Sequence, residues 1–292
     1  MLESLEWFML KTIKRIKQIN RIVNELQSSM IVKKCIYMSD GIALTTLWDG
    51  SKVYVNCKDR SVAPHLLLNG EWEMDITKVF IEKLPKQGIV FDCGANHGYF
   101  GLLALSQSQS AVHFFEANKS LSDLVLDSVA LNGWIKRGTV NNLAVSDRSG
   151  DEVTLTVPKG YLGGASLVSG GFKIGGSDLE ISESAKVTTT SIDDYCDLNN
   201  IKYIDLIKID VESYEEQVLK GASRLISDKR VGCIMFEYTP KSYSDTYLNW
   251  MFESFSYIGM IAKDGIIKKI DRKKIASIND LDDWLMLYCE IQ

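Results

Sequence analysis

The first part of the chain alternates apolar and polar residues in the manner of half-buried strands. Alternating runs at Ile31–Tyr37 and Gly41–Trp48 lead to Asp49-Gly50, and Lys52–Val55 continues the pattern. Asp-Gly between two alternating runs favours a hairpin turn, because both residues readily adopt positive φ. We therefore expect a small antiparallel sheet within residues 31–60.

Residues 1–29 have a longer apolar period. Apolar residues recur at a spacing of three to four, at Ile13, Ile16, Ile19, Ile22 or Val23, and Leu26, and the stretch from Lys11 to Arg21 contains five basic residues and no acid. This pattern predicts an amphipathic helix. Such a helix packs on its own domain or on a second copy of the chain, or lies on an anionic membrane surface.

From residue 88 onward, short continuous apolar runs alternate with helical segments. The expected strands are Gly88–Asp92, Ala111–Glu116, Thr139–Val145, Tyr203–Asp210, Gly232–Tyr238, Tyr257–Ile261 and Leu285–Glu290. The expected helices lie near residues 98–108, 118–132, 213–227 and 242–254. This alternation predicts an α/β fold with a mostly parallel seven-stranded sheet and helices on both faces. The expected organisation is a helix (1–30), a β-rich extension (31–87) and an α/β domain (88–292).

An insertion over residues 151–190 interrupts this rhythm. Its tract Gly160–Ser166 is rich in glycine, and Gly170-Gly171 and Gly175-Gly176 follow. Ligands of parallel sheets bind at the carboxyl ends of the strands. A mobile glycine-rich loop is expected here, of the kind that covers such a site.

The first expected strand leads into a loop with the spacing of a cofactor-binding turn. It ends at Asp92, and Gly94 and Gly98 bracket a tight turn into the next helix. Glycine permits close approach of a ligand, and the N–H groups of a helix start attract a negative group. A dinucleotide loop requires G-x-G-x-x-G, but Asn96 occupies the place of the second glycine. A smaller zwitterionic methionine moiety fits this loop better than a pyrophosphate.

The second expected strand ends in an acid, Glu116. An acid at this position is suited to accept hydrogen bonds from both ribose hydroxyls of an adenosine. The loop and the acid together predict S-adenosylmethionine as the cofactor.

The order of several short elements makes the chain resemble the FkbM family of class I methyltransferases over about residues 40–240. These elements are Gly70–Glu73, Val90–Phe100, Phe115–Asn118, Ala144–Asp147, Thr190–Asp194 and Ile207–Glu215. The resemblance implies a Rossmann-like fold, S-adenosylmethionine as methyl donor, and mostly O-methylation of sugars, glycans or other secondary metabolites.

The resemblance also implies roles for individual residues. The methionine part is expected at a loop that comprises Asp92, Gly94, Ala95, Asn96 and Gly98. The ribose is expected at Glu116, with Ala117 and Asn118 alongside, and the adenine beside Leu143, Ala144 and Val145. The chain departs from the family at Ser213, where glycine is usual, and at His97, where an apolar residue is common.

Three charged residues share one face of the strand Tyr203–Asp210 and its continuation. Alternation places Lys208, Asp210 and Glu212 together, and Glu237 ends the neighbouring strand. Charges on a central strand are costly unless they are paired or face a cleft. We expect Asp210 to act as the general base or to accept the substrate hydroxyl, with Lys208, Glu212 and Glu237 beside it. A bracing network without catalysis is the alternative.

His97 is a second candidate base, since an unperturbed imidazole titrates near neutral pH. A packing role in the loop is the alternative. Asp210, Glu212 and Glu237 are the candidates for a divalent metal, but the family does not generally imply one, so no metal is expected.

Composition narrows the class of acceptor. The net charge is −5, which disfavours nucleic acid, and the six cysteines lack zinc or redox spacing. No signal peptide or membrane-spanning run is expected, which favours the cytoplasm. The expected function is O-methylation of a sugar, glycan (as in polysaccharide biosynthesis) or natural product. The alternatives are N- or carboxyl-methylation of a small molecule or peptide, and a catalytically silent binding protein.

Overall fold

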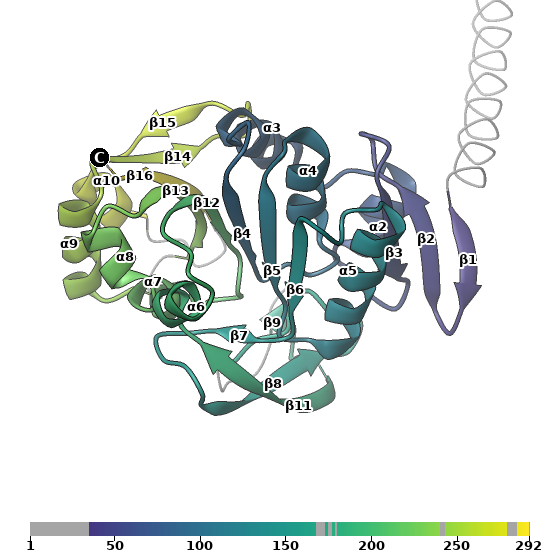
Figure 1. Cartoon of the computed structure of the whole chain (residues 1–292). Helices are drawn as coiled ribbons and strands as arrows, with labels where there is room; N and C mark the ends of the chain where they lie inside the picture. The colour runs from purple at the N-terminus through teal and green to yellow at the C-terminus, as the bar shows by residue number, and fades with distance from the viewer. Residues whose placement is uncertain are drawn as a thin grey trace, which may run out of the picture.

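An eight-stranded sheet forms the centre of this computed structural model (Figure 1), which describes residues 35–167, 173–174, 177–178, 180–239, 243–278 and 285–291. The expected helix over residues 1–29 lies outside the described residues. The strand order is β15-β14-β16-β13-β12-β4-β5-β6. Its strands are β4 (Ile89–Cys93), β5 (Ala111–Phe115), β6 (Gly138–Asn141), β12 (Ile204–Ile209), β13 (Val231–Tyr238), β14 (Tyr257–Ile261), β15 (Ile267–Lys269) and β16 (Leu285–Glu290).

Five neighbouring strands of this sheet, from β13 to β6, run parallel. Strands β16, β14 and β15 complete one edge and pair antiparallel. The predicted fold class is therefore confirmed. The short edge strand β15 was not predicted, because its three residues carry two lysines and no apolar run.

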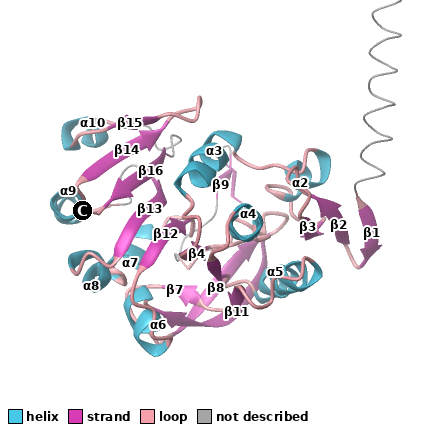
Figure 2. Ribbon diagram, turned by 45° about the horizontal axis from the view of Figure 1, so that its top comes forward, coloured by secondary structure: helices cyan, strands magenta, loops and turns pink. Residues whose placement is uncertain are grey.

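Helices cover both faces of the sheet because its strands are apolar on both sides (Figure 2). One face packs against α2 (Ala63–Leu68), α3 (Met74–Lys83), α4 (Tyr99–Gln107) and α5 (Lys119–Leu131). The other packs against α6 (Ile192–Leu198), α7 (Glu215–Lys220), α8 (Ser223–Ser227), α9 (Asp245–Ser254) and α10 (Arg272–Ala276).

Two predicted elements are divided in the structure. The predicted helix 213–227 is α7 followed by α8, and it breaks at Gly221, where a Cβ would lie 2.0 Å from the Ser146 carbonyl oxygen. The predicted strand Thr139–Val145 is β6 followed by β7 (Ala144–Val145), which belongs to another sheet. Between them Asn142 donates side-chain hydrogen bonds to the carbonyls after β5, which bends the chain.

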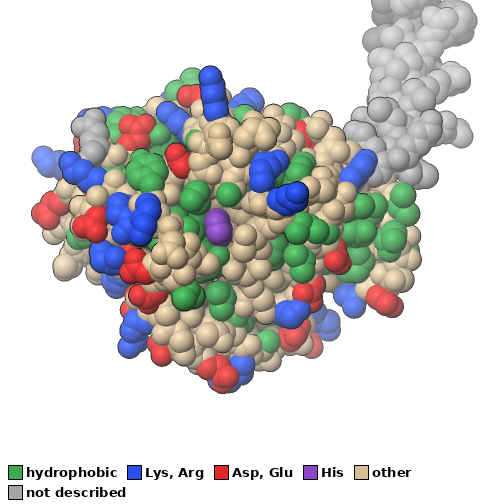
Figure 3. Space-filling model, viewed as in Figure 1, with side chains coloured by type: hydrophobic (Ala, Val, Ile, Leu, Met, Phe, Trp, Pro, Cys, Tyr) green, Lys and Arg blue, Asp and Glu red, His purple; other side chains and the backbone are tan. Residues whose placement is uncertain are grey.

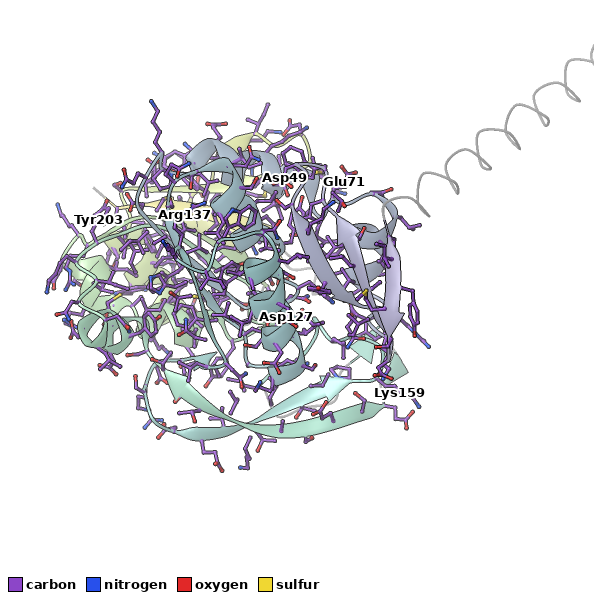
Figure 4. All side chains as sticks on the ribbon, turned by 45° about the vertical axis from the view of Figure 1, so that its right-hand side comes forward. Asp49, Glu71, Asp127, Arg137, Lys159 and Tyr203 are labelled. Carbon is purple, nitrogen blue, oxygen red and sulfur yellow. The ribbon has the colours of Figure 1, made fainter. Side chains whose placement is uncertain are left out.

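The insertion contains a hairpin that the sequence did not reveal. Strands β8 (Glu152–Pro158) and β11 (Ile181–Thr190) pair antiparallel, and β7 joins β11 in parallel. The short strands β9 (Lys173–Ile174) and β10 (Ser177–Asp178) also pair. Figure 4 places Lys159, next to the end of β8, close to the strands of the extension.

The predicted sheet of the extension is present as β1 (Ile36–Ser39), β2 (Ile42–Thr46) and β3 (Lys52–Asn56), all antiparallel. The extension also contains α2 and α3, so it is less purely β than expected. The β3 backbone is joined to α5 because the Tyr54 N–H donates to Ser128 Oγ at 2.9 Å. Apolar side chains gather on the surface around β1 and β2 (Figure 3), where β1 exposes Ile36, Tyr37 and Met38.

Candidate active site

A cavity of about 750 Å³ lies at the carboxyl ends of β4, β5, β12 and β13. The extension, the sheet and the glycine-rich tract all contribute to its wall. Most of the predicted site residues line it: Asp92, Gly94, Ala95, Asn96, His97, Glu116, Ala117, Ala144, Val145, Lys208, Asp210, Glu212 and Glu237. Gly98 and Asn118 do not line it; they shape the starts of α4 and α5.

Gly94 allows the loop after β4 to touch the loop after β12. Its φ is +80°, and a Cβ on it would lie 1.8 Å from the carbonyl oxygen of Asp210. The N–H groups of Gly94 and Ala95 both donate to the Phe115 carbonyl, at 2.9 and 3.0 Å. These two N–H groups therefore bind the sheet and are not available to a ligand carboxylate.

Asp92 is buried beneath this loop and supports the start of α4. Its Oδ2 accepts the Gly101 N–H at 2.8 Å. Burial raises the pKa of Asp92 to about 6, although Lys208 and this hydrogen bond act in the opposite direction. The Asp92 carboxylate thus holds the helix start at the floor of the cavity.

Glu116 joins the two loops that a nucleoside would contact. Its Oε2 accepts the Asn96 N–H at 2.7 Å, and its Oε1 accepts the Asn118 N–H at 2.8 Å. Burial raises the pKa of Glu116 to about 7, and these two hydrogen bonds partly offset the rise. The carboxylate is fixed by backbone donors and retains lone pairs for further donors.

The glycine-rich tract lies against the cofactor loop. A Cβ on Gly163 would lie 2.4 Å from Asn96 Nδ2, so only glycine fits without a shift. Asp59 holds the tract in place, because its Oδ1 accepts the Leu162 N–H while its Oδ2 accepts two N–H groups at the start of α2. The described part of the tract is therefore anchored to the extension; Gly170, Gly171, Gly175 and Gly176 lie outside the described residues.

One side of the cavity is apolar. Its lining there comprises Leu143, Ala144, Val145, Leu155 and Leu162. The first three follow β6, as the sequence predicted for the adenine site. A flat base with few polar contacts suits such a wall.

Lys208 and Asp210 form an ion pair at the opposite side. Lys208 Nζ lies 2.9 Å from Asp210 Oδ2 and 4.8 Å from the centre of the Phe100 ring. The Lys208 side chain is 1% exposed and that of Asp210 is 30% exposed. Burial lowers the pKa of Lys208, but the carboxylates of Asp210, Glu73 and Asp92 outweigh it and the pKa is raised. Lys208 is a buried cation that fixes a carboxylate at the cavity edge.

Three further carboxyl groups line the same end, and each has a raised pKa. Burial is the largest cause for each, and the neighbouring acids add to it; the pKa is about 7 for Glu73, about 8 for Glu212 and about 10 for Glu237. Sequence reasoning did not assign Glu73 to the site. The sequence element Gly70–Glu73 contains Glu73 and could have pointed to it. However, only the packing of α3 on α4 brings Glu73 near Lys208.

The turn after Asp210 is left-handed at two residues that are not glycine. Glu212 has φ +54° and Ser213 has φ +69°. Glycine would adopt this φ without strain. The serine therefore keeps the turn at a conformational cost.

His97 is 1% exposed, and its Nε2 accepts the N–H of Asn56 at 3.2 Å. Burial lowers the pKa of His97 to about 4, although Asp59 raises it. The imidazole lone pair therefore tethers the cofactor loop to β3, which favours the packing role over a base. The other two histidines contact aromatic rings: His65 meets Trp72 edge-on, and His113 bonds the Tyr195 hydroxyl.

Within the described ranges, no group of three or more His, Cys, Asp or Glu side chains is arranged to hold a metal ion. None of the described helices has the length and apolar character needed to span a bilayer.

The family model described as the methyltransferase FkbM domain matches residues 92–285. No curated protein matches the chain. Similar solved structures include M. capricolum TrmK with S-adenosylhomocysteine, which has 10% identity and a TM-score of 0.38 and covers 74% of this chain and 67% of that one.

Two other solved structures are similarly distant. The precorrin-6y C5,15-methyltransferase of Geobacter metallireducens has 8% identity and a TM-score of 0.41, covering 75% of this chain and 88% of that one. The Pyrococcus abyssi tRNA (uracil-54, C5)-methyltransferase with S-adenosyl-L-homocysteine has 11% identity and a TM-score of 0.45. The match covers 87% of this chain and 45% of that one. At such distances the tRNA and precorrin named for two of these proteins say nothing about the acceptor of this chain.

Proposed function

The chain belongs to the FkbM methyltransferase family, and from that premise we propose that it methylates a hydroxyl group of a sugar, glycan or natural product. It is an S-adenosylmethionine-dependent methyltransferase. When bound, S-adenosylmethionine supplies an electrophilic methyl group on a sulfonium. The cavity fits this cofactor, since a close-approach loop, a fixed acid and an apolar wall follow one another along it.

We propose that the chain holds the cofactor through three groups of residues. The Glu116 carboxylate accepts hydrogen bonds from the ribose hydroxyls, and Leu143–Val145 pack on the adenine. The loop Asp92–Gly98 surrounds the methionine part. Asn96 supports this assignment, since its Oδ1 is buried and has no hydrogen-bond partner among the described residues. A ligand ammonium or hydroxyl would satisfy it.

The ion pair of Lys208 and Asp210 carries the proposal for the chemistry. Asp210 stands at the carboxyl end of β12 and is partly exposed to the same cavity as Glu116. A hydroxyl acceptor requires a group that takes its proton as the O–C bond forms. Asp210 accepts that proton, and Lys208 holds the carboxylate in one position. Orienting the acceptor in line with the methyl group supplies the rest of the rate.

The test uses radiolabelled S-adenosylmethionine, a panel of methyl glycosides and the Asp210→Asn variant. We expect methyl transfer to a glycoside hydroxyl, mapped by NMR. Asp210→Asn should lower turnover by about 10²- to 10⁴-fold while S-adenosylhomocysteine binds normally in calorimetry. Full turnover by this variant would remove Asp210 from the role of base.

An amine acceptor is the second candidate, since Glu73, Glu212 and Glu237 favour a cation in the cavity. A carboxylate acceptor is disfavoured, because Lys208 is the only lysine or arginine among the described residues that line the cavity and it is already paired with Asp210. A catalytically silent protein would bind S-adenosylmethionine but transfer no methyl group to any acceptor of the panel.

The cellular setting is also a proposal. We place the protein in the cytoplasm because its cysteines are unpaired, and four of them (Cys93, Cys196, Cys233 and Cys289) are buried. Self-association or peripheral membrane contact through residues 1–30 stays a prediction, as does the absence of a nucleic-acid partner.

A further inference from the structure

The acceptor end of the cavity contains more carboxyl groups than cations. Lys208 is paired with Asp210, and Glu73, Glu212 and Glu237 line the same cavity. Within the part of the chain that the structure describes, no hydrogen bond or ion pair reaches the carboxyl oxygens of these three glutamates. Lys208 is the only lysine or arginine among the described residues that line the cavity. The protein thus leaves one buried carboxyl oxygen, that of Glu73, without a partner, and places the carboxyls of Glu237 and the more exposed Glu212 in the same cavity.

Glu73 points independently to a ligand. Its Oε2 is shielded from solvent and has no partner among the described residues. Its backbone is left-handed, with φ +41°, which is unfavourable for a residue with a side chain. An unsatisfied buried oxygen and a strained backbone at one residue are the kind of costs that persist at functional sites.

Three aromatic residues line the same cavity as these carboxyls. Trp72 precedes Glu73, Tyr214 follows Glu212 by two residues, and Tyr161 belongs to the tract that covers the cavity. Carboxylates combined with aromatic faces are a recurrent way to bind an ammonium group. The buried Lys208 ammonium is itself held by a carboxylate and the Phe100 ring.

We infer that the acceptor carries a protonated amine near the hydroxyl that is methylated, as an amino sugar does, and that Glu73, Glu212 and Glu237 bind it. This inference rests on the proposed hydroxyl methylation. An ammonium ligand supplies the positive charge that these residues lack.

Proton linkage gives the inference a specific signature. Burial raises the pKa of Glu237 to about 10, so Glu237 retains its proton near neutral pH while no cationic ligand is bound, and the pKa of the more exposed Glu212 is raised in the same direction. The other ionisable groups that face them are Asp210, Glu215, Glu73 and Lys208. An ammonium favours the ionised carboxyls, so its binding should release protons, whereas a neutral glycoside should release none.

The test is calorimetry on the full chain saturated with S-adenosylhomocysteine. The probes are methyl 2-amino-2-deoxyglucopyranoside and its two neutral counterparts, the 2-acetamido glycoside and methyl glucopyranoside. The amine should bind at least about tenfold more tightly, as expected for hydrogen bonds to a charged group. Its heat of binding should vary with the ionisation enthalpy of the buffer. Equal affinities, or no binding by any probe, would overturn the inference.

Variants separate the cavity from general charge effects. Glu73→Gln and Glu237→Gln should each reduce the preference for the amine, and Glu253→Gln, at an exposed position on α9, should keep it. Unchanged S-adenosylhomocysteine affinity shows that each variant is folded. A preference that survives both cavity variants would contradict the assignment.

The site of methylation distinguishes this inference from the proposed function. If the amino glycoside binds preferentially and its nitrogen is methylated, hydroxyl methylation is rejected and the cationic acceptor is kept. Methylation of neutral glycosides at oxygen, without preference for the amine, would keep hydroxyl methylation and reject the cationic acceptor.

Discussion

Replacing Gly94 by alanine tests the contact between the loops after β4 and β12. Two costs add at this position. A φ of +80° disfavours a residue with a Cβ by about 1–2 kcal/mol. The Cβ would also lie 1.8 Å from the Asp210 carbonyl oxygen, and relieving such overpacking typically costs about 1–3 kcal/mol. Gly94→Ala should therefore lose about 2–5 kcal/mol of unfolding free energy.

Gly133→Ala is the matched control. Gly133 has φ +76°, but nothing lies within 4 Å of the position that a Cβ would occupy, so only the backbone cost applies. In urea denaturation, Gly94→Ala should lose about 1–3 kcal/mol more unfolding free energy than Gly133→Ala, and this difference measures the cost of the steric contact. Relief of the clash must move the segment that holds Asp210, so Gly94→Ala should also weaken S-adenosylhomocysteine binding in calorimetry.

Equal losses in the two variants would refute the steric argument, because both would then reflect the backbone alone. Normal S-adenosylhomocysteine affinity in a destabilised Gly94→Ala protein would instead refute the coupling between the two loops.

Three further changes test other parts of the site. Ser213→Gly should stabilise the protein by about 0.5–1 kcal/mol in urea denaturation, because glycine adopts the φ of +69° without strain; a loss of stability would contradict this. Lys208→Met should cost about 3–5 kcal/mol in the same assay, because it leaves buried carboxyls without their cation, and a neutral result would mean that they simply protonate. With the pKa of Glu116 raised to about 7 by burial, its carboxylate is lost as pH falls through 7, so S-adenosylhomocysteine affinity should fall up to about tenfold per pH unit below 7. Glu116→Gln should abolish this pH dependence, and a slope that persists would assign it to another group.

The parallel strands could be predicted because they are buried on both faces and read as continuous apolar runs. The sequence pattern is weaker where tertiary contacts decide. The helical spacing of apolar residues over 213–227 continues through Gly221. The helix nevertheless breaks at Gly221, because the chain after β7 lies close to this glycine. The hairpin of β8 and β11 was missed although Val153, Leu155 and Val157 alternate with polar residues in β8, because β11 lacks such an alternation and its first four residues are exposed.

Some residues of the candidate site could be predicted from the sequence, and others could not. Asp92, Glu116 and Asp210 could be placed because each ends a strand of a fold that binds ligands there. Glu73 and the role of His97 could not, because their partners are distant in sequence. The imidazole accepts the Asn56 N–H from β3, and Glu73 reaches the Lys208 environment through α3.

The extension contributes to the site through the same kind of distant contacts. Besides the Asn56 bond to His97, Asp59 accepts the Leu162 N–H of the glycine-rich tract, and Trp48 Nε1 donates to the Tyr99 hydroxyl at the start of α4. Each bond reaches a different part of the cofactor environment: the loop, its cover and the helix. We therefore propose that the boundary near residue 87 divides the chain by pattern and not by function, since the 31–87 segment positions the machinery that the 88–292 segment carries.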